Sequence, residues 1–138
     1  MARLKESVLG TSDPDGEKEK LWKRELRYWD LFFRGDRRCL DMVADAFLGW
    51  PHNADSPVPK SGLEKTLAGN RENSLTPVLE PLGICLERNV AVIHLTRKLS
   101  RESSGMTEHS AKIRVLHTWL KQDREWLLLG GMGYPERE

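Results

Sequence analysis

The alternation of residues in the segment 109–122 constrains the fold more than any other feature of this chain. One face of the segment carries apolar side chains and one histidine, at Ile113, Val115, His117 and Trp119. The other face is polar, with Lys112, Arg114, Thr118 and Gln122. Because successive side chains of a strand point to opposite sides, the segment predicts a strand with one buried face. A histidine on a buried face has a polar partner or lines a cavity, which makes His117 the first candidate for chemistry.

Length and composition bound the class of protein. At 138 residues the chain can form one domain with a substantial core. Its 22 Lys and Arg against 21 Asp and Glu give a net charge of +1, which does not favour a nucleic-acid partner. No apolar run approaches the roughly 18 residues of a membrane span, so no membrane partner is expected. Cys39 and Cys85 lack metal-type spacing and have apolar neighbours, so we expect buried free thiols and a cytoplasmic location.

The periodicity of the first half predicts helices. Residues 1–14 are polar and are expected to be a flexible lead-in, followed by a single domain over 15–135. A stripe of apolar residues at helical spacing predicts a helix over 17–34, with Trp22, Leu26, Trp29 and Phe33 on its buried side. A second helix is expected after Asp36, with Leu40, Val43 and Phe47 on one side.

The rest of the chain predicts an extended piece, a short helix and a sheet. Three prolines place an extended piece and a loop over 47–59. Ser61 and Glu64 form a capping box for a third helix that ends near Asn70. Strands are expected at 76–86, 90–101, 109–122 and 125–134. Gly130, Gly131 and Gly133 in the last strand are consistent with a sharp bend, with the close approach of a ligand or neighbouring chain, or with a bulge that has no function.

This order of elements predicts an α+β fold, in which a curved antiparallel sheet wraps around N-terminal helices. Strands of ten or more residues curl, and a curled sheet closed by a helix forms a conical pocket.

Four segments carry a resemblance to a known superfamily: RYWDLFFRGD (27–36), VADAFLGWP (43–51), PKSG (59–62) and HTWLKQDREW (117–126). In their order and spacing they resemble the nuclear transport factor two-like superfamily, also called SnoaL-like or cystatin-like. This superfamily includes polyketide cyclases, ketosteroid isomerase, scytalone dehydratase, limonene epoxide hydrolase and the kinase II association domain. The resemblance covers residues 17 to 135 and implies the α+β cone.

The resemblance also implies site residues. Tyr28 matches the tyrosine with which ketosteroid isomerase donates a hydrogen bond to the substrate oxyanion. His117, two residues before Trp119, matches a position that holds a functional acid in the isomerase and an arginine in the association domain. His94 matches another pocket arginine of the association domain. The isomerase has its aspartate base where this chain has Trp50, which cannot take a proton, and His52 or Asp55 replaces that base only if the loop folds inward.

Each candidate also has a structural interpretation. His117 and His94 can be core or wall residues, and two histidines without a third ligand do not indicate a metal site. Tyr28 can pack in the core instead of donating to a ligand. Further candidates for the pocket wall, or for the core, are Trp50, Trp119 and Met132. Tyr134 either closes the mouth of the cone or lies at a dimer contact.

Two functions follow from these residues, and the sequence leaves open whether the protein is an enzyme. In the first, a hydrophobic pocket binds an apolar, carbonyl-containing metabolite, without a cofactor or metal. His117 then moves a proton and Tyr28 polarises the carbonyl in a cyclisation, isomerisation or dehydration. In the second, the protein is a non-catalytic module that binds a ligand or associates with itself. The resemblance implies a homodimer through the outer face of the sheet, and the side chains expected there, Arg114, Leu116, Thr118 and Leu120, are compatible with such an interface.

Overall fold

The computed structural model describes residues 4–10, 13, 15–73, 75–103 and 105–136. The helices are α1 (Glu6–Leu9), α2 (Glu17–Phe33), the 3-10 helix η1 (Arg37–Met42) and α3 (Lys60–Asn70). The strands are β1 (Val43–Trp50), β2 (Val58–Pro59), β3 (Thr76–Glu87), β4 (Val90–Ser103), β5 (Met106–His109), β6 (Ile113–Gln122) and β7 (Glu125–Pro135). None of the helices within the described ranges is long and apolar enough to cross a membrane.

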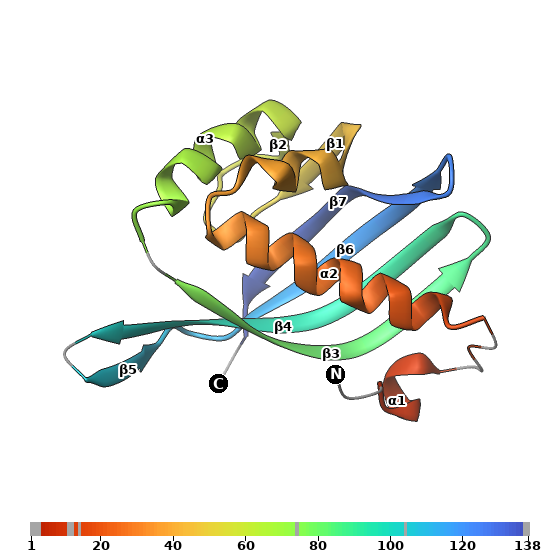
Figure 1. Ribbon diagram of the computed structural model, residues 1–138, viewed down its shortest axis with the longest axis horizontal. Helices are drawn as coiled ribbons and strands as arrows, with labels where there is room; N and C mark the ends of the chain where they lie inside the picture. Colours follow the sequence, from red (N-terminus) through yellow and green to blue (C-terminus); the bar gives the residue numbers. More distant parts are fainter. Residues whose placement is uncertain (1–3, 11–12, 14, 74, 104, 137–138) are drawn as a thin grey trace.

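The strands form one curved, open sheet in the order β2-β1-β7-β6-β4-β3, and β5 pairs with the far end of β4. Neighbouring strands are antiparallel, except for β1 and β7, which are parallel. Figure 1 shows α2 lying across the sheet and α3 beside β1 and β2. This is the α+β arrangement predicted from the sequence, with a curved sheet wrapped around an N-terminal helix.

The first long helix forms as its apolar spacing predicts. The carboxylate of Asp13 accepts hydrogen bonds from the backbone N–H groups of Lys18 and Glu19, which satisfies donors that the first turn leaves free. The helix ends at Phe33, and Gly35 follows with a φ of 67°, a left-handed conformation that suits glycine.

The expected second helix is the main correction. Asp36 caps a helix, as predicted, because its side chain accepts from the N–H of Arg38. That helix is the short η1, and Val43 and Phe47 lie in β1. A spacing of four residues places two side chains on one face of a helix and also on one face of a strand. The pairing of β1 with β7 decides between the two.

Smaller differences concern the ends of elements. Ser61 lies inside α3, whose cap position is Pro59 with no side-chain cap, so the capping box does not form. The expected strand 109–122 is divided, since Met106–His109 forms β5 and β6 begins at Ile113. In the expected lead-in, residues 1–3, 11–12 and 14 lie outside the described residues, whereas Glu6–Leu9 is helical and buries Val8.

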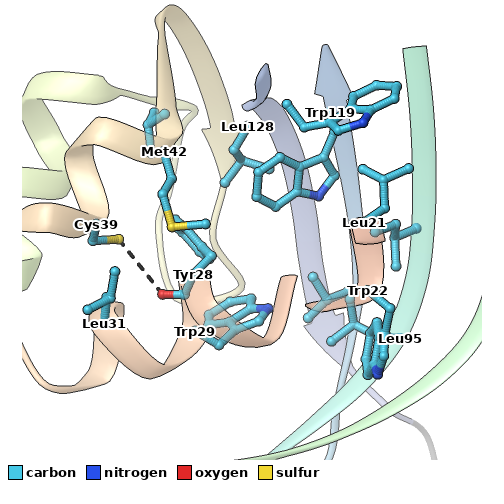
Figure 2. Close-up of a cluster of buried hydrophobic side chains, with 14 of the residues drawn as sticks. Leu21, Trp22, Tyr28, Trp29, Leu31, Cys39, Met42, Leu95, Trp119 and Leu128 are labelled. Atoms are coloured by element: carbon cyan, nitrogen blue, oxygen red, sulfur yellow. Dashed lines mark hydrogen bonds between the residues drawn. The ribbon is translucent and has the colours of Figure 1, made fainter. Parts of the chain in front are cut away.

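The core lies between α2 and the concave face of the sheet. The inward side chains of β6 are buried in the predicted alternation, at Ile113, Val115, His117 and Trp119. Figure 2 shows side chains from α2, η1 and the sheet gathered in this core. The cysteines differ from expectation in one respect: Cys39 is a buried free thiol, but Cys85 is exposed.

Two glycines of β7 stand where other strands approach closely. A Cβ on Gly130 would overlap the backbone oxygen of Leu48, and one on Gly131 would overlap the backbone oxygen of Leu116. The same Cβ on Gly131 would lie 2.6 Å from Cδ2 of His117. The groups that approach these two glycines closely are strands of the same chain, and the contact at Gly131 holds His117 against β7.

We expect Gly131→Ala to lower the free energy of unfolding by about 2 kcal/mol, because the new methyl group overlaps backbone that cannot move without breaking the β6–β7 pairing. Urea unfolding measures the change. Gly83→Ala in β3 is the matched control, since a Cβ there has no atom within 4 Å. Equal stability of the two variants would contradict this account of Gly131.

Candidate functional site

A buried carboxylate joins α2 to β6 at the centre of the molecule. Oε2 of Glu25 lies 2.7 Å from Nδ1 of His117, and Nε1 of Trp119 donates to Oε1 of Glu25 at 3.0 Å. Glu25 is 0% exposed and His117 is 7% exposed. An ionised group in this position needs hydrogen bonds to replace water, and each of its two oxygens has one.

The contact with Glu25 determines how His117 presents its ring. A carboxylate only accepts hydrogen bonds, so Nδ1 of His117 carries the proton in this pair. The contact occupies Nδ1 and leaves Nε2, on the other side of the ring, for a ligand. The ring stacks on Trp29, with 5.1 Å between centroids and 9° between planes, and meets Tyr28 edge-on at 5.6 Å. The orientation of His117 is therefore fixed from two sides.

His117 lines a cavity of about 90 Å³, measured as the space open to the centres of water molecules. The wall is mostly aromatic and apolar, with residues from α2, β1, β4, β6 and β7. Its polar members are Tyr28, His52, Arg97 and His117. A largely apolar concave wall with a few converging polar groups is typical of a small-molecule site.

Tyr28 is buried and lines this cavity. Burial raises the pKa of its hydroxyl well above 10, and the nearby Cys39 and Glu25 raise it further. The hydroxyl therefore stays protonated at neutral pH and is able to donate a hydrogen bond.

The loop after β1 was expected to supply a replacement base only if it folds inward, and most of its residues are exposed. His52 lines the cavity, whereas Asp55 is exposed and is not part of its wall. Burial lowers the pKa of His52, and the positive charge of Arg97 lowers it further. His52 is therefore a neutral imidazole in the wall of the cavity at neutral pH.

The structure brings together some of the predicted site residues and separates others. Tyr28 and His117 line the cavity. Trp50 and Met132 border it, but their register with Leu116 places both on the outer face of the sheet. Trp119 is fully buried behind it and acts as a donor to Glu25. Tyr134 is half exposed and stands beside Arg114, at 5.9 Å, away from the cavity wall.

His94 lies on the other face of the sheet from the cavity. On β4 the buried side chains are Ala91, Ile93, Leu95 and Arg97, apart from Thr96 on the opposite face. His94 has the opposite parity, is exposed and pairs with Leu116 of β6. Strand alternation therefore removes His94 from the candidate site and introduces Arg97 in its place.

Sequence reasoning missed Glu25 and Arg97. The signal for Arg97 was present, because it continues the inward alternation of Ile93 and Leu95. Glu25 lies three residues after Trp22, on the buried side of α2, but glutamate at such a position is usually exposed. Its partners are 92 and 94 residues away in the sequence, so no local pattern announces them.

No protein-family model matches the sequence, and no curated protein matches it. Solved structures do match. The chain has the NTF2-like, cystatin-like fold. An NTF2-like protein of Novosphingobium aromaticivorans superimposes with a TM-score of 0.70 at 14% identity, over 87% of this chain and 86% of that one.

Two further structures share this fold. A Mycobacterium tuberculosis protein of unknown function superimposes with a TM-score of 0.74 at 13% identity, over 91% of this chain and 76% of that one. The association domain of the C. elegans kinase CaMKII gives 0.71 at 11% identity, over 86% and 95%. Identities this low establish the NTF2-like fold alone, so function has to be argued from the site.

Within the described part of the chain, no group of three or more His, Cys, Asp or Glu side chains is placed to hold a metal ion. The chemistry available at the site is that of two imidazoles, a phenol, a guanidinium and a buried carboxylate. These groups transfer protons and donate hydrogen bonds.

We expect Glu25→Ala to lower the free energy of unfolding by about 3 kcal/mol, because it leaves two buried donors without acceptors. Glu25→Gln retains one acceptor oxygen and loses less stability. Glu64→Ala, an exposed position of α3, is the matched helix control. Urea unfolding of the three variants makes the measurement, and a Glu25→Ala variant as stable as Glu64→Ala would contradict the role of Glu25.

Proposed function

We propose that the protein binds a small carbonyl-containing molecule in this cavity and that His117 transfers a proton to or from it. The contact between Glu25 and His117 carries the proposal. A histidine needed only for packing could be satisfied by an uncharged acceptor, without the cost of burying a carboxylate, and an apolar residue at both positions would give comparable stability. A carboxylate behind Nδ1 supports proton transfer at Nε2, since it stabilises the imidazolium that forms.

Each polar group then has a role in a reaction without a cofactor. Nε2 of His117 accepts a proton from an atom next to the carbonyl and returns it elsewhere, which amounts to isomerisation, cyclisation or dehydration. Tyr28 donates a hydrogen bond to the carbonyl oxygen as negative charge develops there. General acid–base catalysis by one such group contributes roughly 10²–10⁴-fold in rate. The apolar wall excludes water from the reacting atoms.

We expect the wild type, incubated with a host metabolite extract, to consume a compound that His117→Ala and His117→Gln leave unchanged. His117→Gln guards against loss of the fold, because its amide is able to contact Glu25. His94→Ala is the matched control, since it removes an exposed histidine from the far face of the sheet. Mass spectrometry of the extract makes the measurement. Normal consumption by His117→Gln would overturn the assignment of the proton to His117.

Self-association is the second candidate function, and the outer face of the sheet favours it. Large apolar side chains of β1 and β7 are exposed there: Leu48 at 57%, Met132 at 51%, Tyr134 at 50% and Trp50 at 41%. Leu116 and Leu120 of β6, both part-exposed, alternate with the buried residues of that strand. A continuous apolar surface of this kind indicates an interface. A second copy of the chain fits it best, because paired identical faces bury the same apolar strip twice.

We expect the protein to be a dimer in solution and Met132→Glu to be a monomer, because the interface would bury two new charges, one from each copy. Met106→Glu on β5 is the matched control, since Met106 is 70% exposed and lies away from β7. Light scattering after size-exclusion chromatography gives the mass. A monomeric wild type would overturn this candidate without affecting the proton-transfer proposal.

The free thiols support a reducing compartment, and we place the protein in the cytoplasm. Cys39 is buried, and burial raises the pKa of its thiol to about 12, so it is unreactive. Cys85 is exposed on β3, where an oxidising compartment would modify it.

A further inference from the structure

Arg97 lies in the wall of the same cavity, where it follows Ile93 and Leu95 on the inward face of β4. Its side chain is 8% exposed, and its guanidinium lies 4.9 Å from the ring centre of Trp29 and 5.1 Å from that of Phe33. Trp29 also stacks on His117. One indole therefore contacts both the cation and the candidate proton-transfer group.

Arg97 has no acceptor. Among the described residues, no hydrogen bond or ion pair reaches its guanidinium, and its Nε is buried without a partner. Nε1 of Trp29 is the other buried donor of the described residues without a partner, and it belongs to the same wall. The carboxylate of Glu25 serves neither donor, because it is occupied by His117 and Trp119. Such orphaned buried donors are rare in native proteins.

The charge of Arg97 is also uncompensated. Burial lowers the pKa of Arg97 to about 10, and the group stays cationic at neutral pH. The ionisable groups beside it are Tyr28, which is neutral, and His52, whose pKa is lowered by burial and by Arg97 itself. Aromatic faces offset part of the cost of burying a cation, but they supply no hydrogen-bond acceptors. Arg97 therefore brings a positive charge to the cavity wall, and the described residues that line the cavity include no carboxylate to pair with it.

We infer that the ligand of this cavity is a small organic carboxylate whose two oxygens bind the guanidinium of Arg97 while its apolar body packs against the aromatic wall. The inference rests on the proposed function of the cavity as a ligand site and adds the chemical class of the ligand. Guanidinium and carboxylate match as a planar, two-bonded pair. The cavity is small, with about 90 Å³ open to the centres of water molecules, which suits a ring or short chain with one carboxylate.

The position of Trp29 connects the class of ligand to the reaction. The indole of Trp29 contacts both Arg97 and His117, so these two residues lie close together. A small molecule whose carboxylate binds Arg97 is therefore able to present a neighbouring carbon or carbonyl to His117. Arg97 therefore binds and orients the substrate, and His117 moves the proton. Binding and turnover depend on different residues and are measured separately.

The test compares acids with their uncharged analogues. Benzoate, phenylacetate and hexanoate are titrated into the wild type by calorimetry, each beside its own primary amide, in a buffer without organic acids. We expect at least one acid to bind ten times more tightly than its amide, because a charge-assisted pair is stronger than a neutral one. Arg97→Met is expected to abolish the preference. Arg114→Met is the matched control on the outer face, and it keeps the preference.

Two further measurements separate binding from folding. If Arg97 is present for a ligand, Arg97→Met melts no lower than the ligand-free wild type, because the substitution removes an uncompensated buried charge. Arg97→Lys keeps the charge and is expected to retain a weakened preference for acids, since it loses the two-bonded geometry. Three results together would overturn the inference. Arg97→Met would melt far below the wild type, the wild type would prefer acids over amides by less than twofold, and Arg97→Lys would show that same preference.

The remaining outcomes distinguish the two proposals. Equal binding of acids and amides to the wild type overturns the carboxylate class and leaves the cavity as a ligand site. No binding of any probe overturns the carboxylate class together with the cavity as a site for such molecules. Normal acid binding by His117→Gln supports the separation of roles, whatever its turnover.

Discussion

The buried carboxylate of Glu25 is the interaction on which the rest of the structure depends. It stands on α2 and binds two side chains of β6, so it fixes how the helix sits over the sheet. Moving the helix by one side chain would leave a charge and two donors buried without partners, which no nearby contact compensates. Tyr28 and Trp29, one turn further along the helix, contact the ring of His117 and line the cavity.

The concave face of the sheet combines two polar groups that stability alone would not select. His117 is hydrogen-bonded to Glu25 of the helix. Arg97, on the neighbouring strand, contacts the aromatic rings of Trp29 and Phe33 instead. Apolar residues would fill both positions at a lower energetic cost. Exceptions to the local rules of folding are expected at functional sites. Here both exceptions, His117 and Arg97, line the same cavity.

The sequence predicted the parts of this structure that follow from local periodicity. The alternation of β6 placed His117 inward, and the helical stripe of α2 gave both its ends within a residue. The segment after Asp36 was misjudged, because a spacing of four fits helix and strand equally and only the pairing with β7 decides. His94 was set on the wrong face by the resemblance, although alternation along β4 already favoured Arg97. The role of Glu25 could not be predicted from the sequence, because its partners, His117 and Trp119, come from the other end of the chain.

The sheet order has a consequence for how the chain assembles. β7 lies between β1 and β6, and until it is present the 8-residue β1 has only the two-residue β2 as a neighbour. The first long strand, β1, therefore gains its main neighbour only when β7 is present. Pairing β1 with β7 closes a loop that contains most of the chain, which is a slow step in folding. Gly49 and Gly131 face each other across this seam and line the cavity. During synthesis on the ribosome, the cavity therefore cannot form until β7 has been made.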